Sequence, residues 1–431
     1  MSLRSRGATG SAARTARVLA RFGATTAAMT RRLDRYDAIM SDAGARPTWP
    51  TTACVLDRHP ALLRRYAERG VELALHGLVH GDHAALDHRE QRETIVRAVD
   101  IFHRAGLHPV GFRGPYLRYN SATLDVLREL GMTYHCSQAV AFPVLDQAMP
   151  PRAAANYQLA LELYSARDAR RVAVIPRLRD GLVDIPVAIP DDEVLIERLG
   201  FSPEDRIATW RDLLGLTYER GELFTIQLHP ERILELAEAL RAVLAEAQRR
   251  RPGVFVAQLH EIASWWTRRA EARLDVSRIG GDRYRVHLAA AADVTLLVRG
   301  LDIPRSPWCG RDDRAEQRTF ETGSPRAPIV GISRRSPAAI GTFLAEEGLP
   351  FEISEEREGY GAYIDVADAS WSETAIVDTI ARSPGPLVRI WRWPSAARSA
   401  LAITGDIDAL TLRDFISRSW ETRRPRSGGL S

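Results

Sequence analysis

The fold is decided by one stretch near the start of the chain, His59-Pro-Ala-Leu-Leu-Arg-Arg-Tyr-Ala-Glu-Arg-Gly70-Val71-Glu-Leu-Ala-Leu-His76. Its first part spaces apolar residues as an amphipathic helix does, and Gly70 stands where a helix C-cap is expected. The run from Val71 to His76 is short and mostly apolar, as in a buried strand. A helix, a glycine and a buried strand in this order are typical of one repeat unit of an α/β protein.

The same alternation continues on both sides of this stretch, from about residue 12 to residue 268. The predicted strands are Pro47–Leu56, Val71–His76, Pro109–Arg113, Met132–Ser137, Gly181–Val187, Glu222–His229 and Gly253–His260, and the predicted helices include His59–Arg69, Arg89–Ala105, Ser121–Leu130 and Glu231–Arg249. Alternating strands and helices predict a parallel sheet covered by helices, as a barrel or a doubly wound sheet. In both folds, functional residues gather at the carboxyl ends of the strands.

Composition excludes several classes of protein. The chain has 431 residues, 45% hydrophobic and 26% charged, which is ordinary for a globular enzyme and unlike a disordered protein. No apolar run reaches the roughly 20 residues of a membrane helix, and the basic start lacks the apolar segment of a secretory signal, so we expect a cytoplasmic protein. All 59 basic residues are arginine, but a net charge of +4 without an arginine and aromatic stripe argues against nucleic-acid binding. Three distant cysteines, Cys54, Cys136 and Cys309, fit a reducing compartment.

The pattern changes after Trp266. Strands are predicted within Arg273–Arg299, Pro304–Pro328 is predicted to be a loop, and strands and one helix follow up to Trp391. We therefore predict three segments: a barrel over 12–270, a small α+β domain over 272–394, and a C-terminal strand and helix over 396–422 that complete the barrel.

Four motifs follow predicted strands and carry chemically useful side chains. The first is Leu75-His76-Gly-Leu-Val-His80, whose two histidines can meet on one metal ion if the turn curls helically. The second, Gly111-Phe-Arg113-Gly-Pro115-Tyr116, puts at a strand end an arginine able to orient a carboxylate. For each of these motifs taken alone, the alternative to a functional role is that its side chains are structural or lie in solvent.

The other two motifs supply an acid-base group and carboxylates. Phe224-Thr-Ile-Gln-Leu228-His229-Pro230 places His229 at the tip of a buried strand, where it can act as a general acid or base. Thr404-Gly405-Asp406-Ile407-Asp408 ends an apolar strand with two acids. One of them can bind a metal ion while the other acts as a base, or one can cap the following helix.

Together, the order H-x-x-x-H, R-x-P-Y, D-x-P and L-H-P at successive strand ends resembles the NodB-homology polysaccharide deacetylases, carbohydrate esterase family four. The resemblance covers about residues 30–268. It implies a distorted (β/α) barrel, one divalent metal ion held by an aspartate and two histidines, and the removal of acetyl groups from sugars.

One family motif is displaced. The family pattern ends its first strand with T-F-D-D, but before Pro47 this chain offers only Asp34 and Asp37, in a helical run. The missing motif is found at the other end of the chain, with Asp406 and Asp408. We therefore predict a circular permutation in which the C-terminal strand returns to the barrel as its first strand.

The resemblance implies roles for the matched residues. The metal ligands would be Asp408, His76 and His80, and the catalytic residues Asp406, His229, Arg113, Tyr116 and Asp184. Asp406 would be the general base, oriented by Arg113, and a backbone N–H near Tyr116 would help the metal stabilise the oxyanion. His229 would protonate the leaving amine, with Asp184 tuning it. Because D-x-D departs from T-F-D-D, which acid is base and which is ligand stays open.

The predicted function is a metal-dependent hydrolase that removes an acetyl group from an acetamido sugar or glycoconjugate. Zinc suits the donor set best, and cobalt, nickel or manganese also suit it. The alternatives are hydrolysis of another C–N bond, in a formamide or a cyclic ureide, and a non-catalytic glycan-binding module on a degenerate barrel. We expect the small domain to flank the cleft; the sequence leaves the oligomeric state and the exact substrate open.

Overall fold

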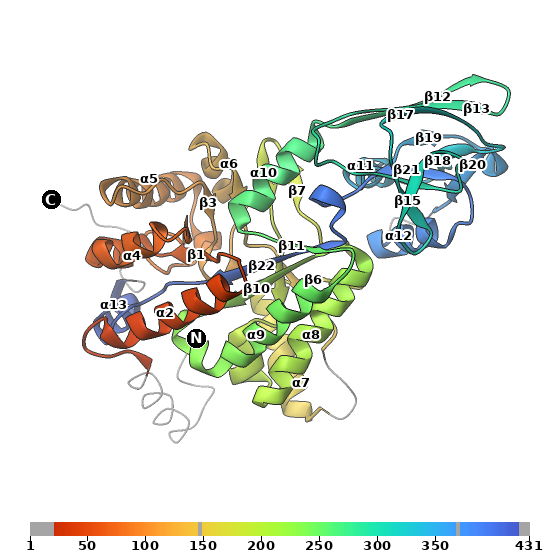
Figure 1. The fold of residues 1–431 in the computed structure, drawn as a ribbon. Helices are drawn as coiled ribbons and strands as arrows, with labels where there is room; N and C mark the ends of the chain where they lie inside the picture. Colours follow the sequence, from red (N-terminus) through yellow and green to blue (C-terminus); the bar gives the residue numbers. More distant parts are fainter. Residues whose placement is uncertain (1–20, 145–148, 368–370, 422–431) are drawn as a thin grey trace.

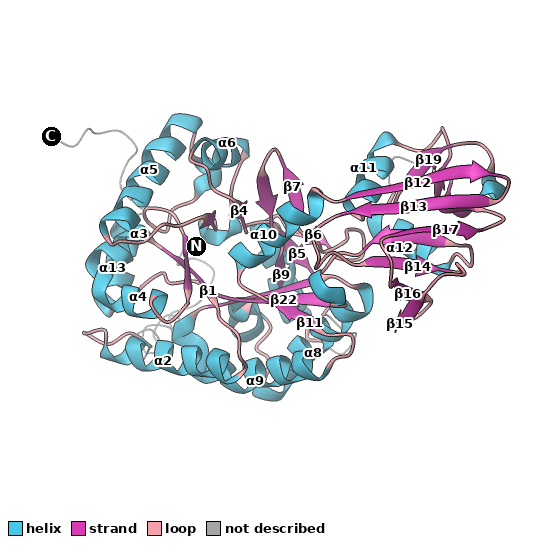
Figure 2. Ribbon diagram, turned by 45° about the horizontal axis from the view of Figure 1, so that its top comes forward, coloured by secondary structure: helices cyan, strands magenta, loops and turns pink. Residues whose placement is uncertain are grey.

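The computed structural model describes residues 21–144, 149–367 and 371–421. Figure 1 shows a helix-covered sheet on one side and a smaller part on the other, and Figure 2 shows that the smaller part is rich in strands. Residues 12–20 and residue 422, which the predicted domains include, lie outside the described residues. The domain boundaries themselves stay predictions.

The larger part is built on a nine-stranded, mainly parallel sheet in the order β10-β22-β1-β2-β3-β4-β8-β7, with β11 also paired to β22. Its strands are β1 (Thr48–Thr51), β2 (Glu72–Leu75), β3 (Gly111–Phe112), β4 (Tyr134–His135), β7 (Arg177–Arg179), β8 (Leu182–Asp184), β10 (Leu223–Leu228), β11 (Val254–Val256) and β22 (Ser399–Gly405). A second sheet joins β5 (Ala139–Ala141), β6 (Arg167–Asp168) and β9 (Val187–Ile189). The predicted α/β class, a distorted β/α barrel, is confirmed.

Helices cover the outside of this sheet (Figures 1 and 2). They are α2 (Ala27–Asp42), α3 (Ala53–Arg58), α4 (Pro60–Ala67), α5 (His88–Arg104), α6 (Ser121–Glu129), α7 (Pro151–Tyr164), α8 (Pro203–Arg220), α9 (Ile233–Arg249), α10 (Leu259–Ala270) and α13 (Leu412–Glu421). Helix α8 is not among the helices named from the sequence. Its start is nevertheless marked there, because Ser202 and Asp205 form a capping box around Pro203 in its first turn.

The first strand is shorter than predicted. β1 ends at Thr51 rather than Leu56, and helix α3 begins at Ala53. Thr52 ends the strand by donating its backbone N–H to the carbonyl of Ile407, at 3.3 Å. The apolar residues that looked like the rest of a strand therefore form the buried side of a short helix.

The C-terminal strand β22 lies inside the sheet, between β10 and β1. It pairs in parallel with β10 over six residues, from Leu223 opposite Ala400 to Leu228 opposite Gly405, and all seven of its residues are buried. A strand that is covered on both faces has a nearly continuous run of apolar residues, and this explains the apolar sequence of β22. This is the position predicted for a displaced first strand, while the circular permutation itself stays a prediction.

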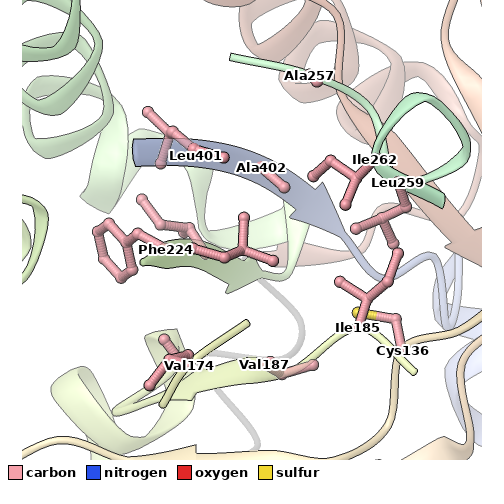
Figure 3. Packing of buried hydrophobic residues seen from close by; sticks show 14 of the residues in the cluster. Cys136, Val174, Ile185, Val187, Phe224, Ala257, Leu259, Ile262, Leu401 and Ala402 are labelled. Atoms are coloured by element: carbon pink, nitrogen blue, oxygen red, sulfur yellow. The ribbon is translucent and has the colours of Figure 1, made fainter. Parts of the chain in front are cut away.

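The barrel core is formed by side chains from strands far apart in the chain. Figure 3 shows Leu401 and Ala402 of β22 with Phe224 of β10 and, across the interior, Val187 of β9 and Cys136. All five residues are at most 2% exposed. Burying each large apolar side chain contributes about 1.5–3 kcal/mol, so the core fixes β22, and with it the loop that follows, in place.

The smaller part contains three further sheets, in the orders β12-β13-β17, β15-β16-β14-β21 and β19-β18-β20. Its elements are β12 (Arg273–Gly280), β13 (Arg283–Ala289), β14 (Leu296–Arg299), β15 (Arg305–Cys309), β16 (Asp312–Ala315), β17 (Thr319–Gly323), β18 (Ala327–Ile332), α11 (Ala338–Glu346), β19 (Phe351–Ile353), β20 (Tyr360–Ile364), α12 (Glu373–Arg382) and β21 (Leu387–Ile390). The loop predicted over Pro304–Pro328 is wrong, because β15, β16 and β17 lie there. Pro307 is tolerated because β15 is an edge strand, and β17 alternates exposed residues with buried Phe320 and Thr322.

The smaller part joins the barrel at the amino-terminal end of β22, while the expectation that it flanks the cleft stays a prediction. Only a short connection, which includes Arg392, separates β21 from the first residue of β22. Arg392 donates to the carbonyls of Arg220 and Gly221, just before β10, at 2.8 and 3.1 Å. The acids of the fourth motif lie at the opposite end of β22, about 20 Å away at roughly 3.3 Å per residue.

Candidate functional site

The motif residues meet at the carboxyl ends of adjacent strands. His76 follows β2, Arg113 follows β3, His229 follows β10, and Asp406 and Asp408 follow β22. These strands are neighbours in the order β10-β22-β1-β2-β3, so their ends share one edge of the sheet. The edge is the place where parallel α/β proteins build their sites.

Three buried side chains form a compact group there. Ligand atoms of His76, His80 and Asp408 all lie within 4.8 Å of one another, and this is the one such group that a search of the described residues finds. His76 Nε2 lies 3.4 Å from Asp408 Oδ1, and His80 Nε2 lies 3.2 Å from Asp408 Oδ2. Two imidazoles and one carboxylate are the donor set of many catalytic zinc sites, which keep a further position open.

Two observations test whether this group fits a metal ion. His76 Nδ1 lies 2.8 Å from the carbonyl oxygen of Arg113 and donates to it, which leaves Nε2 with its lone pair toward Asp408. Asp408 Oδ1 is buried and has no hydrogen-bond partner among the described residues. A buried oxygen without a partner, facing an imidazole lone pair, is costly unless a cation binds between them. The three residues therefore fit a divalent ion.

The electrostatics of the group give its members the protonation that metal ligands need. Burial lowers the pKa of His80 well below its usual range, and the Asp408 charge offsets only part of this effect. Burial alone would raise the pKa of Asp408, but its interaction with His80 and the charge of Arg418 hold it well below its usual range. Near neutral pH the site thus offers an ionised carboxylate and a neutral His80.

Asp406 lies beside this group and is held from two sides. Arg113 Nη1 donates to its Oδ1 at 2.8 Å, and Gln227 Nε2 donates to its Oδ2 at 2.7 Å. Arg113 is fully buried and is itself fixed by the carbonyl of Cys136, at 3.0 Å from its Nε. The structure thus brings together Arg113 and Asp406 as the resemblance implied. It also favours Asp408 over Asp406 as the ligand, since His76 Nε2 is 3.9 Å from Asp406.

Sequence reasoning missed Gln227. It lies on β10, two residues before His229, which follows the strand in an extended conformation, so both side chains point to the same side. The signal that could have found Gln227 is a long polar side chain in a mostly apolar strand, two residues before a candidate catalytic histidine.

His229 is paired with a different acid from the one expected. Asp192 Oδ1 lies 2.8 Å from His229 Nδ1, and Asp192 Oδ2 accepts the backbone N–H of His229 at 2.9 Å. Burial alone would lower the pKa of His229, but the fully buried Asp192 carboxylate raises it well above its usual range. His229 is therefore charged and able to give up a proton near neutral pH.

The assignment of Asp184 as the residue that tunes His229 is corrected. Asp184 lies opposite His135 in the β4–β8 register, 3.4 Å from its Nε2. Side chains alternate along a strand, so Asp184 faces away from Ile185, which lies with Cys136 in the interior (Figure 3). The acid that contacts His229 is Asp192, and the contact of Asp184 is with His135.

Tyr116 lies at the mouth of the group. Its ring is edge-on to His80, with the ring centroids 4.4 Å apart, and 39% of the residue is exposed. Its backbone is left-handed, with φ at 60°, which is uncommon for a residue other than glycine and is found most often at functional sites. Tyr116 therefore presents an aromatic surface beside the candidate metal ligands.

A separate surface cavity of about 600 Å³ lies between α10, β11 and residues 394–397. Phe255 and Trp265 line it, and Phe255 pairs with Ala400 near the start of β22. It is thus at the amino-terminal end of the sheet, and none of the candidate catalytic or metal-binding residues lines it.

Comparison with known proteins gives the following matches. The family model "Polysaccharide deacetylase" matches residues 22–135. A peptidoglycan deacetylase-like protein of Gibberella zeae is 30% identical over 91 residues, 21% of this chain and 27% of that protein, so the match spans about a quarter of the relative. Among solved structures, a Mycobacterium smegmatis protein assigned as a polysaccharide deacetylase is 24% identical over 54% of this chain and 76% of its own, with a TM-score of 0.42. One from Pseudomonas aeruginosa PAO1 is 20% identical over 55% and 73%, with a TM-score of 0.43.

Proposed function

Starting from the family match over residues 22–135, which confirms the resemblance predicted from the motifs, we propose that this chain is a metal-dependent deacetylase of acetamido sugars or glycoconjugates. The matched segment contains His76, His80 and Arg113 but ends before His229 and the two C-terminal acids. The observation that carries the proposal is that the fold brings Asp406 and Asp408 to the histidines of the matched segment.

An amide is cleaved when water is activated, the carbonyl is polarised and the leaving amine is protonated. A divalent ion held by His76, His80 and Asp408 would supply the polarisation and acidify a water molecule. Asp406 accepts the proton of the attacking water, and Arg113 and Gln227 hold its two oxygens in place. His229, charged through its contact with Asp192, gives its proton to the leaving nitrogen.

The substrate class follows from the family match and from the mouth of the site. Tyr116 presents a half-exposed ring next to His80, against which the apolar face of a sugar ring can pack. No helix among the described residues has both the length and the apolar composition needed to cross a bilayer. A cytoplasmic location stays a prediction.

The proposal is tested first by measuring bound divalent metal per chain in the wild type and in Asp408→Ala. We expect about one zinc ion in the wild type and a large loss in the variant, since only two protein ligands would remain. Release of acetate from acetamido sugars is then compared with hydrolysis of formamides and of a cyclic ureide. Equal metal in both proteins would contradict the assignment of Asp408. No metal in either, even after loading, would favour the glycan-binding module.

The pH profile tests the pairing of His229. A general acid must be protonated, so kcat is lost as pH rises through the pKa of His229. Because the Asp192 carboxylate raises this pKa, Asp192→Asn lowers it, and the alkaline limb of the kcat profile moves to lower pH. The matched variant Asp184→Asn, whose side chain lies against His135, leaves the limb in place. A limb that moves in the second variant and not in the first would refute the pairing.

A further inference from the structure

Helix α13 folds back over the end of β22. Its first turn is fixed by Asp414, whose Oδ2 accepts the backbone N–H groups of Leu410 and Thr411 at 3.1 and 2.9 Å. The same carboxylate pairs with His59 Nε2 at 3.0 Å and with Arg58 Nε at 2.7 Å. The helix is therefore anchored to the turn between α3 and α4, within the barrel part of the protein.

Arg418 lies one helical turn beyond Asp414, on the same face of α13, since residues four apart are neighbours on a helix. Its Nη1 donates to Asp408 Oδ2 at 2.5 Å, and its side chain is 27% exposed. The two oxygens of Asp408 thus differ. Oδ2 is held by the guanidinium and lies 3.2 Å from His80 Nε2, while Oδ1 is buried without a hydrogen-bond partner among the described residues, 3.4 Å from His76 Nε2.

We propose that Arg418 is a positioning residue for Asp408: by holding Oδ2, it fixes the carboxylate against His76 and His80 and leaves Oδ1, which faces His76, for a divalent ion bound by the three residues. The inference rests on the proposed function, because it concerns the same site. The inference assigns a role in the site to Arg418 of α13, a helix outside the segment 22–135 that the family model matches.

Two opposing effects decide the size of this contribution. A guanidinium near the site repels a divalent cation, which would weaken binding. However, the guanidinium contacts Oδ2, which also faces His80, and not Oδ1, so the oxygen next to His76 is left for the cation. Without Arg418, a carboxylate in a site that is only 7% exposed would lose its charge partner and be free to rotate. Losing a hydrogen-bond partner of a metal ligand typically weakens metal binding about 10- to 100-fold, so we expect the positioning effect to prevail.

The test measures the affinity of the full chain for zinc alone, by competition with a chromophoric chelator. Arg418→Ala is expected to weaken zinc binding about 10- to 100-fold. Arg418→Lys, which keeps a charged donor, recovers part of the loss. Arg413→Ala, an exposed arginine on the same helix, leaves the affinity unchanged. Unchanged or tighter binding by Arg418→Ala would overturn the proposal.

Two further arms keep the result interpretable. Circular dichroism and the melting temperature check each variant, and Arg418→Gln replaces Arg418→Ala if the latter does not fold. If the wild type binds no zinc, both the proposed function and this inference fail. If the wild type binds zinc and Asp408→Ala loses it while Arg418→Ala matches the wild type, only the inference fails.

Discussion

Replacing Asp406 with asparagine is expected to lower kcat about 10²- to 10⁴-fold while leaving the bound metal in place, because the change removes a general base and no metal ligand. The substitution keeps the shape of the side chain. Its amide oxygen can still accept from Arg113 Nη1, now 2.8 Å from Oδ1. On the other side, the Gln227 amide can turn so that Oε1, which has no partner among the described residues, accepts the new N–H.

The measurement combines kcat on an acetamido sugar with zinc content in the same preparation. The matched variant is Asp408→Asn, two residues further along the chain, which is expected to lose zinc. This pair resolves the question that the D-x-D spacing leaves open. If Asp406→Asn loses the metal and Asp408→Asn keeps it, the two acids have exchanged roles. If Asp406→Asn retains kcat within tenfold of the wild type, Asp406 is not the base.

Local patterns were enough to predict the parts of the site that follow strands. The apolar run of β22 and the two acids after it are adjacent in the sequence, so both the buried strand and the position of its carboxylates could be expected. The motifs with His76, Arg113 and His229 likewise place a functional residue directly after a buried strand. Where a functional residue directly follows a buried strand, topology alone brings it to the edge of the sheet.

Residues outside such motifs could not be predicted in this way. Asp192 lies at the start of a short helical segment after β9, and only the tertiary fold places it against a histidine 37 residues later. Asp184 was chosen instead because it precedes Ile-Pro, but strand alternation turns its side chain away from the interior. Arg418 is one of many arginines on a helix, and nothing in its local sequence singles it out.

The place of the smaller part could have been predicted from topology. A domain inserted directly before a parallel strand must lie near the amino end of that strand, because the connection from β21 to β22 is short. The site lies at the carboxyl end of the same strand. The length of β22 therefore separates Asp406 from the point where the smaller part joins the barrel.

One buried acid near the junction between the smaller part and the barrel is Glu347. It is fully buried after α11, and its Oε2 accepts from Arg392 Nη2 at 2.6 Å and from Arg389 Nη2 at 3.0 Å. Arg392 is 1% exposed and also bonds the carbonyls before β10. Burial alone would raise the pKa of Glu347, but the charges of Arg392 and Arg389 hold it below its usual range. Its stabilisation is thus complete above the ordinary glutamate pKa and is lost as pH falls through the lowered value.

Glu347→Ala is expected to destabilise the protein by about 3–5 kcal/mol, because it leaves buried guanidinium groups without a counter-charge. The free energy of unfolding in urea is measured by tryptophan fluorescence, since Arg389 lies 4.8 Å from the ring centroid of Trp391. Glu358→Ala is the matched control: its side chain is 86% exposed and pairs with Arg326, so its loss changes stability by less than about 1 kcal/mol. Equal stability of the two variants would mean that the arginines are hydrated or paired elsewhere once Glu347 is gone. A large loss only in Glu347→Ala would show that the buried ion cluster contributes strongly to the stability of the protein.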